Sequence, residues 1–371
     1  MTQEPTLQKL RALPVQLIQA HDGVILARGR LEVKISGEDA AKVVEIVLTA
    51  AAGQGATQEE ICAIFAAPDR PAVAELVEQL MARRILVSTD TAGAPLETWE
   101  SSLDVFYWHF GARAELVTER LNSQHIVIIG VNCVSRQLVA SLSASGAESI
   151  QVVDYPLLRN LRLFDDRGQL LSEQWPGSLK SPVEYQRWVD AIDAESIDCL
   201  VATSDFGGSQ LMREWNEFCV SHQRHFLPVI LDKLVGYVGP LVLPGETACY
   251  ECLRARENAN MEAPELQRAA EGVAYERQAV TGFHPSMASV LGDLATIELT
   301  KLYSKVLTPK VGTLIEVKLL VPELTSRKVL KNPRCPVCSP LNRRSSTTPR
   351  KNVFMPGNVF MPGRPSHGVG T

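Results

Sequence analysis

Two Cys-x-x-Cys pairs lie far apart in the 371-residue chain, and they limit its possible folds more than any other feature. Cys249 and Cys252 form the first pair, and Cys335 and Cys338 form the second. Four thiolates suit a closed tetrahedral Zn²⁺ site that keeps no position open for chemistry. Because about eighty residues separate the pairs, such a metal would close a large domain rather than build a small finger. We therefore expect a structural zinc; unrelated buried thiols and a redox dithiol are the alternatives.

The composition is that of an ordinary soluble protein, with 45% hydrophobic residues, 21% charged residues and a net charge of -5. This charge gives no sign of a nucleic acid or an acidic membrane as a partner. The four cysteines outside the two pairs lie in apolar runs, which favours a reducing compartment over a disulfide framework. The first residues lack a signal-peptide pattern, and no apolar run is long enough to span a bilayer. We expect a cytoplasmic protein.

The first 92 residues predict a small domain in which three strands precede three helices. The stretch 31–35 alternates apolar and polar residues, as a half-buried strand does. Thr57 and Glu60 are spaced as a capping box, which begins a helix. The order is that of a winged-helix-like domain. Strands are predicted at 14–18, 24–27, 31–35 and 85–87, and helices at 38–51, from 57 onward and at 71–83.

The third of these helices argues against DNA as the partner, because Glu75 and Glu78 would face phosphates. A sheet edge beside an apolar helix can instead accept an extended peptide as a further strand. We predict such a peptide site, in which Val33 supplies a main-chain donor; a purely structural helical cap is the alternative. The predicted contacts are Leu31, Val33, Lys34 and Ile35 on the edge, and Val73, Leu76, Val77 and Leu80 on the helix.

Residues 93–124 read as a linker followed by one amphipathic helix, 99–121. A second domain, 125–341, opens with a continuous apolar strand, a helix over 134–145 and a second strand that ends at Asp154. Strand, turn, helix, strand and acid form the skeleton of a dinucleotide-binding βαβ unit, in which the acid binds a ribose hydroxyl.

The turn of this unit departs from the G-x-G-x-x-G pattern, since it carries Gly130, Asn132 and Ser135 at the three glycine positions. The second glycine normally lets a phosphate approach the backbone. Asn132 adds a side chain where that phosphate would lie. The pattern therefore predicts βαβ geometry with a vestigial nucleotide pocket, and it favours loss of ATP and Mg²⁺ binding.

From about residue 120 to 340 the chain resembles the ThiF and ubiquitin-activating adenylating superfamily. The resemblance rests on the βαβ start, Asp154, the strand end Ala202-Thr-Ser-Asp205 and the run 239–252. Within that superfamily the chain is most similar to the ThiF-like partner protein of azoline-forming peptide cyclodehydratases, on residues 253–258 and 331–338. Its first domain resembles the precursor-recognition domain of ribosomal-peptide maturases, similar to the small chaperone of PQQ biosynthesis, on residues 22–30 and the order of its elements.

The resemblance implies a leader-peptide-binding component that presents a precursor, for example of a thiazole- or oxazole-containing bacteriocin, to a separate YcaO-type cyclodehydratase. It also implies which residues stand at the nucleotide positions of active members: Asp154 for the ribose, Arg159 or Arg162 near the phosphates, and Asp205 for Mg²⁺. No catalytic cysteine is matched. An ATP-dependent adenylating maturase of the microcin C or pantocin type is the second possibility, and a DNA-binding regulator the third. A homodimer is left open.

The C-terminal part of the sequence predicts a polar helix over 262–278, a long helix over 286–306, and a hairpin of 312–320 with 326–330. Residues 342–351 are then basic and polar, and we predict a flexible tail over 342–371. The tail repeats Asn-Val-Phe-Met-Pro-Gly at 352–357 and 358–363. Either a solvated duplication or a docking segment fits this repeat.

Overall fold

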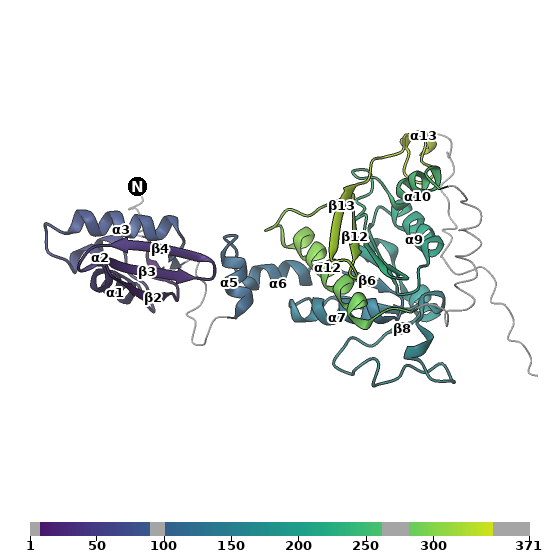
Figure 1. Cartoon of the computed structure of the whole chain (residues 1–371), viewed down its shortest axis with the longest axis horizontal. Coiled ribbons are helices and arrows are strands. Elements are labelled where there is room, and N and C mark those ends of the chain that lie inside the picture. Colours follow the sequence, from purple (N-terminus) through teal and green to yellow (C-terminus); the bar gives the residue numbers. More distant parts are fainter. Residues whose placement is uncertain (1–7, 90–100, 262–281, 344–371) are drawn as a thin grey trace, which may run out of the picture. The chain divides into compact units, whose positions relative to one another are not determined.

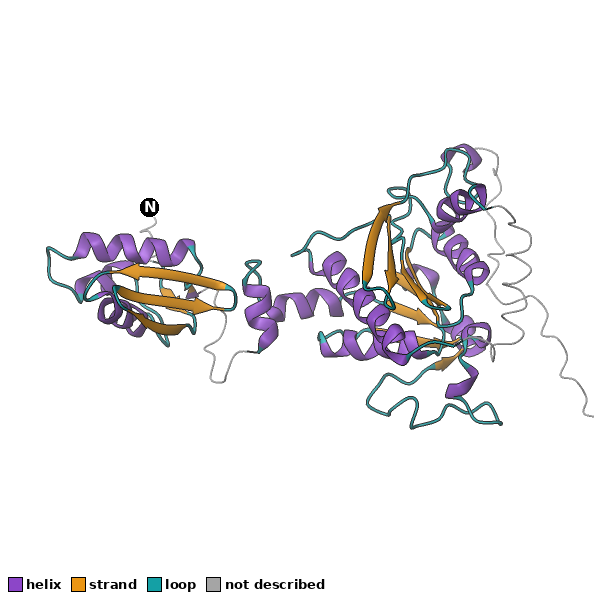
Figure 2. Ribbon diagram, viewed as in Figure 1, coloured by secondary structure: helices purple, strands orange, loops and turns teal. Residues whose placement is uncertain are grey.

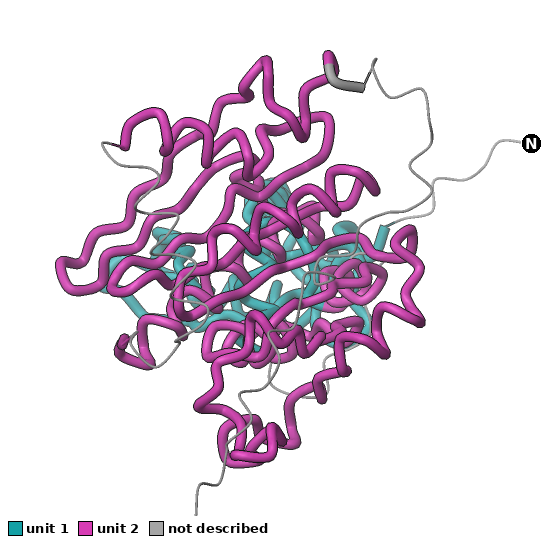
Figure 3. The backbone as a smooth tube through the Cα atoms, turned by 90° about the vertical axis from the view of Figure 1, so that its right-hand side faces the viewer, with its two compact units in different colours: residues 1–114 teal, residues 115–371 magenta. Residues whose placement is uncertain are grey.

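The computed structural model describes residues 8–89, 101–261 and 282–343. The chain forms two compact units, residues 1–114 and residues 115–371 (Figure 3). The helix predicted at 262–278 and the repeats of the tail lie outside the described residues. None of the described helices has the length and apolar character needed to cross a membrane.

The first unit is built around a three-stranded antiparallel sheet in the order β2-β3-β4 (Figure 1). A second, two-stranded sheet pairs β1 with β5. From β2 to β5 the strands and helices follow the predicted order, whereas β1 was not predicted. The elements of this unit are β1 (Leu10–Ala12), β2 (Gln16–Ala20), β3 (Gly23–Arg28), β4 (Leu31–Ser36), α1 (Ala40–Ala50), α2 (Gln58–Ala63), α3 (Arg70–Ala82), β5 (Leu86–Ser88) and α5 (Ser102–Trp108).

The core of this unit lies between one face of the sheet and the helices. It contains Val24 and Leu26 from β3, Val44 and Val47 from α1, and Val77 from α3, all with no exposed surface. The capping box of α2 is present: the Glu60 N–H donates to Thr57 Oγ1 over 3.1 Å, and the Thr57 N–H donates to Glu60 Oε2 over 2.8 Å. Local sequence signals and packing therefore agree in this unit.

The single helix predicted over 99–121 is wrong, because the chain forms two helices there, α5 and α6 (Ala114–Asn122). Gly111 lies between them with a φ of 75°, a left-handed conformation that ends a helix and favours glycine. In the first unit, Trp108 donates its indole N–H to the carbonyl of Arg84 over 2.8 Å, and the guanidinium of Arg28 lies 4.7 Å from the Trp108 ring centre. These contacts fix α5 against the end of β3 and the turn that follows α3.

The second unit is a mixed α/β domain with an eight-stranded sheet in the order β13-β12-β11-β10-β9-β6-β7-β8. Neighbouring strands from β10 to β8 are parallel, whereas β11, β12 and β13 add antiparallel pairs. Helices lie on both faces of the sheet (Figure 2). The strands are β6 (Ile126–Ile129), β7 (Ile150–Asp154), β8 (Val183–Glu184), β9 (Cys199–Ser204), β10 (His225–Asp232), β11 (Val235–Val238), β12 (Thr313–Lys318) and β13 (Glu323–Lys328).

The helices of this unit are α6, α7 (Cys133–Ala144), α8 (Tyr185–Ala191), α9 (Ser209–Ser221), α10 (Tyr250–Ala259), α12 (Pro285–Ser304) and α13 (Pro340–Arg343). Helix α7 packs along α12, and α9 contacts α10. Strand β6 is buried at every residue, as its continuous apolar sequence predicts. The predicted βαβ start, long helix and C-terminal hairpin are therefore confirmed.

Candidate functional site

The four cysteines of the two Cys-x-x-Cys pairs come together in the second unit. Their sulfur atoms all lie within 4.8 Å of one another. Cys249 Sγ lies 3.6 Å from Cys335 Sγ, and Cys252 Sγ lies 3.4 Å from Cys338 Sγ. Zn–S bonds of about 2.3 Å in a tetrahedron place the sulfur atoms about 3.8 Å apart. The donor set and its spacing therefore fit one Zn²⁺ ion.

Helix α10 and its neighbours hold the first pair. Cys249 is the N-cap of α10 and Cys252 lies in its first turn, and neither has exposed surface. The side chain of Asn216 on α9 accepts the Tyr250 N–H over 2.9 Å. The guanidinium of Arg213, also on α9, makes two bonds to the carboxylate of Glu251, of 2.5 and 2.9 Å. These polar partners, which the sequence did not single out, orient the first pair toward the core.

The second pair follows β13 and reaches the same place through a turn. The backbone N–H of Asn332 donates to Cys252 Sγ over 3.3 Å, which links the two pairs directly. Cys335 is buried in the same core cluster as Cys249 and Cys252. A metal at this position would hold the segment after β13 onto the core through coordination bonds.

The turn between β6 and α7 is the place where a nucleotide phosphate would bind in a βαβ unit. Gly130 has a φ of 102°, and a Cβ atom there would lie 2.9 Å from the carbonyl oxygen of Thr203. The next residue of the pattern, Asn132, is fully buried. Its amide nitrogen donates to the carbonyl of Leu158 over 3.1 Å and to the carbonyl of Thr203 over 3.0 Å. The Asn132 side chain therefore fills the turn.

The N–H groups that open α7 all have partners within the chain. Asn132 Oδ1 accepts the N–H groups of Val134 and Ser135, over 3.1 and 3.0 Å. Asp205 Oδ2 accepts the N–H of Cys133 over 2.9 Å. A helix N-terminus binds phosphate through such free N–H groups. Here a carboxylate and an amide oxygen already occupy that position.

Asp205 lies at the end of β9, with 1% of its surface exposed. Asn160, which the sequence did not single out, donates its amide to Asp205 Oδ2 over 2.8 Å. The second carboxylate oxygen, Oδ1, has no hydrogen-bond partner among the described residues. Burial is the largest influence on the carboxyl, and it raises the pKa of Asp205 above the ordinary aspartate range.

Asp154 ends β7, as predicted, but its carboxylate is bound to Arg159. The two N–H···O distances are 2.6 and 2.7 Å, and the Arg159 guanidinium also lies 4.6 Å from the Phe164 ring centre. The side chain of Arg162 is exposed. The structure thus brings Gly130, Asn132 and Asp205 together, while Asp154 and Arg159 form a separate ion pair. The sequence named Arg159 only as one of two cationic candidates.

In the first unit, β4 forms an edge of the three-stranded sheet, as the predicted peptide site requires. Of the predicted contacts, Val33, Val73, Val77 and Leu80 are buried in the core, with 7% exposure or less. Their side chains are not free to touch a ligand. Those of Leu31, Ile35 and Leu76 are half-buried at the margin of the core, and Lys34 is exposed and bound to Asp22 over 2.7 Å.

The register of β4 decides which of its backbone groups are free. Along an antiparallel ladder, opposite residues that exchange two backbone hydrogen bonds (bonded pairs) alternate with opposite residues that exchange none (open pairs). The Gly37 N–H donates to the Asp22 carbonyl over 3.0 Å, so these two residues form a bonded pair next to the β3–β4 ladder. Steps of two residues make Val24–Ile35, Leu26–Val33 and Arg28–Leu31 the next bonded pairs. Among the described residues no strand pairs with the outer side of β4, so the N–H and C=O groups that face this open edge belong to Glu32, Lys34 and Ser36.

This register corrects the part that the sequence assigned to Val33. Its N–H faces Leu26 inside the sheet, so Val33→Pro would break the ladder of the domain itself rather than remove a donor for a ligand. Lys34 is the central residue whose N–H faces outward. The backbone groups of successive residues in a strand point alternately to its two sides. The sequence of one strand does not show which residues point to the open edge, because this depends on how the strand pairs with its neighbour.

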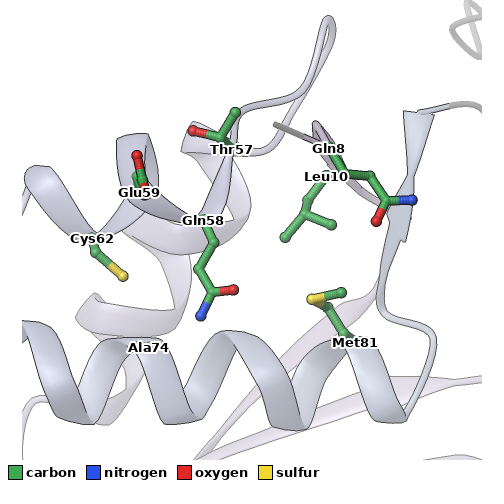
Figure 4. A pocket seen from close by; sticks show the side chains of 8 residues that line it. All are labelled: Gln8, Leu10, Thr57, Gln58, Glu59, Cys62, Ala74 and Met81. Atoms are coloured by element: carbon green, nitrogen blue, oxygen red, sulfur yellow. The ribbon is translucent and has the colours of Figure 1, made fainter. Parts of the chain in front are cut away.

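A hollow of about 480 Å³ lies beside α3 in the first unit (Figure 4). Figure 4 shows the side chains of Leu10, Gln58 and Met81 converging on it. Ala74 and Met81 lie on one flank of α3, and Leu76 lies on the opposite flank at 100° per residue. The hollow is therefore separate from Leu76, the half-buried side chain of α3 that would contact a peptide bound at the β4 edge. It is lined by Gln8, Leu10, Thr57, Gln58, Glu59, Cys62, Ala74 and Met81.

Comparison with known proteins gives a consistent picture at the level of the fold. No family model matches the sequence. The protein HesA of Leptolyngbya boryana is 29% identical over 164 residues, which are 42% of this chain and 52% of that protein. This chain spans about half of HesA, so only that part is compared.

Three solved structures illustrate the likeness. The heterocyclase TruD is 18% identical, with a TM-score of 0.58 over 91% of this chain and 43% of its own. A heterocyclase in complex with substrate and cofactor is 18% identical, with a TM-score of 0.54 over 90% of this chain and 40% of its own. E. coli MccB with ATP is 16% identical, with a TM-score of 0.61 over 89% of this chain and 100% of its own.

The two heterocyclase chains are thus more than twice as long as the part that this chain matches, whereas MccB is matched along its whole length. At these identities the likeness concerns the fold. The resemblance drawn from the sequence is confirmed at that level: the chain has the fold that the heterocyclase TruD and E. coli MccB share.

Proposed function

We propose that this chain is the leader-peptide-binding component of a system that matures ribosomally made peptides. It would present the precursor to a separate YcaO-type cyclodehydratase that forms thiazole or oxazole rings. The observation that carries the proposal is the open edge of β4, whose outward N–H and C=O groups belong to Glu32, Lys34 and Ser36.

Strand addition explains how such an edge recognises an extended peptide. The peptide backbone would pair with Glu32, Lys34 and Ser36, and its alternate side chains would fall on the two faces of the sheet. On the core side they would meet the half-buried apolar side chains of Leu31 and Ile35. Backbone bonds would give affinity, and the side-chain contacts would give selectivity for the leader.

The second unit would act as a scaffold in this proposal. The N–H groups that could hold a phosphate are bound to Asn132 and Asp205. A phosphate would have to displace both and would meet the carboxylate of Asp205, a like charge. The cysteine cluster would hold a structural Zn²⁺, which leaves no coordination position for a substrate.

An ATP-dependent adenylating maturase of the microcin C or pantocin type is the second candidate. The match to the whole length of MccB favours it. Incubation of the purified chain with precursor and Mg-ATP separates the two candidates. The scaffold proposal expects no pyrophosphate release, and sustained precursor-dependent formation of AMP would decide for the adenylating maturase.

The peptide edge is tested by fluorescence polarisation with a labelled precursor leader and the full chain. Lys34→Pro removes the central outward N–H, so leader binding should be lost. Lys34→Ala keeps that N–H and should retain most of the affinity. Gln19→Pro is the matched control, because it places proline on β2, the other edge of the same sheet. A Lys34→Pro protein that folds and binds the leader as well as wild type would overturn the strand-addition site.

A further inference from the structure

Three exposed arginines, the arginine cluster, lie near the start of β4 in the first unit. Arg30 is in the turn before β4, Arg83 is the C-cap of α3, and Arg84 is the next residue. Among the described residues, none of these three guanidinium groups forms an ion pair with a carboxylate. Because the whole chain has a net charge of -5, a group of unpaired positive charges is not a simple consequence of its composition.

His109, which follows α5, contacts both ends of the arginine cluster. Arg84 donates from Nη1 to the carbonyl of His109 over 3.4 Å. The backbone N–H of Arg30 donates to the ring nitrogen Nε2 of the same histidine over 3.3 Å. The turn before β4 and the residues that follow α3 therefore lie next to each other, and the cluster is one feature of the fold.

The cluster lies at one end of the surface that a peptide on the β4 edge would contact. Arg83 comes seven residues after Leu76, which is about two helical turns, so both lie on the same flank of α3. Leu31, the first residue of β4, directly follows Arg30. The surface between β4 and α3 thus has half-buried apolar side chains along it and positive charges where β4 begins.

The carboxylates on neighbouring elements are distant or directed elsewhere. Glu75 precedes the end of α3 by about 12 Å of helix and accepts the amide of Gln79. Asp104 accepts the N–H and the hydroxyl of Ser101 at the start of α5, over 2.9 and 2.7 Å. Glu32 points to the face of the sheet opposite its core, since side chains alternate along a strand. A ligand can therefore supply the missing negative charge.

We propose that the arginine cluster binds an acidic segment of the peptide that pairs with β4. This inference rests on the proposed function and adds the chemistry of the peptide. Its paired segment would place alternate apolar side chains on the core side of the sheet, and its carboxylates would follow where the chain passes Leu31. Guanidinium groups suit this role, because their N–H donors match the geometry of a carboxylate. Opposite charges would also speed the encounter between peptide and edge.

The position of the cluster also relates the acidic segment to the direction of the bound peptide. Strand β4 runs from Leu31 to Ser36, so the arginine cluster lies at its start. In an antiparallel pairing, the residues that pass the start of β4 are C-terminal to the paired segment of the peptide. In a parallel pairing they are N-terminal to it. Acidic residues on only one side of the paired segment should therefore bind well.

Four labelled peptides test the proposal on the full chain by fluorescence polarisation. All share the segment Thr-Leu-Thr-Leu-Thr, which can place its leucines opposite Val33 and Ile35. Two carry four glutamates before or after the segment, and two carry four lysines at the same places. One glutamate peptide should bind about tenfold tighter than its lysine counterpart, because each exposed ion pair changes affinity about two- to threefold. Nonspecific attraction to a negative chain would favour lysine instead. Equal binding, or tighter binding of the lysine peptides, would overturn the proposal.

Charge reversal in the chain separates recognition from loss of folding. The double change Arg30→Glu and Arg83→Glu should reverse the preference, so that the lysine peptide binds tighter. A misfolded protein would lose both peptides instead. Arg70→Glu is the matched control and should keep the preference, because Arg70 begins the same helix on the flank of Ala74 and Met81. An unchanged preference in the double variant would show that the arginine cluster does not contact the peptide.

Lys34→Pro distinguishes failure of this inference from failure of the proposed function. If wild type binds acidic and basic peptides equally and Lys34→Pro binds neither, the β4 edge stands and the role of the arginine cluster is wrong. If acidic peptides bind Lys34→Pro as well as wild type, they do not pair with β4 and both proposals are wrong. A wild-type chain that binds none of the four peptides would also contradict both.

Discussion

The cysteine cluster and the α7 turn are two candidate ligand sites in the same unit, and they differ in what they leave for a ligand. Four sulfur atoms converge at metal-binding distances in the first. In the second, the N–H groups that could bind a phosphate are already bound by Asn132 and Asp205. Four sulfur atoms that converge on one point can bind a metal ion, whereas N–H groups that are already hydrogen-bonded within the chain stabilise the fold without a ligand.

The largest effect is expected at the cysteine cluster. Cys252→Ala removes one of four thiolates, so the metal should be lost and the second unit should be strongly destabilised. Structural zinc contributes on the order of 10 kcal/mol in small peptides. Elemental analysis and thermal unfolding of freshly purified protein measure both effects. Cys62→Ala, in the first unit, should keep the metal, and wild-type protein without any metal would contradict the site.

The next effect is expected at Asn132, the residue that fills the turn. Asn132→Ala leaves buried carbonyls of Leu158 and Thr203 and the first N–H groups of α7 without their partner. We expect a loss of about 2 kcal/mol in the free energy of unfolding. Urea unfolding measures it, with Asn260→Ala at an exposed position as the control. Equal stability of the two variants would show that the Asn132 side chain is not what holds the turn.

The buried carboxyl of Asp205 should make stability depend on pH. Its pKa is raised in the folded state, mainly by burial, so the folded chain holds this proton more tightly than the unfolded chain. The resulting contribution to stability is present below the unfolded pKa, near 4, and is lost as the pH rises through the raised folded pKa. The stability of wild type relative to Asp205→Asn should therefore fall as the pH rises above about 4. Denaturation curves at several pH values measure this, and a rising difference would contradict the assignment.

The smallest effect is expected at the ion pair of Asp154 and Arg159, whose side chains are 15% and 24% exposed. Arg159→Ala frees the carboxylate that the sequence resemblance assigns to a ribose, and we expect a cost of about 1 kcal/mol in the free energy of unfolding. The variant should still bind no ATP, because the N–H groups of α7 keep their partners. Calorimetric titration with Mg-ATP measures this. Binding gained by this single change would show that the ion pair of Asp154 and Arg159 alone had been closing the site.

The sequence by itself determined the features that depend on spacing within one segment. The capping box of Thr57 and Glu60 and the buried strand 126–129 follow from local periodicity and hydrogen-bonding geometry. So does the order of strands and helices, apart from β1 and the break between α5 and α6. The two Cys-x-x-Cys pairs were also readable, because each pair fixes two sulfur atoms within one turn. Their meeting in space was expected, but only the fold brings residues 249–252 and 335–338 together.

The tertiary structure decided every feature that needs a partner from elsewhere in the chain. The sequence placed Asn132 where a phosphate would lie, but its bonds to Leu158 and Thr203 come from other strands and loops. The outward direction of the Lys34 backbone groups depends on the pairing with β3, since a shift of one residue would reverse it. Local sequence sets which elements form, and the free energy of packing them together decides which of their polar groups remain open to a ligand.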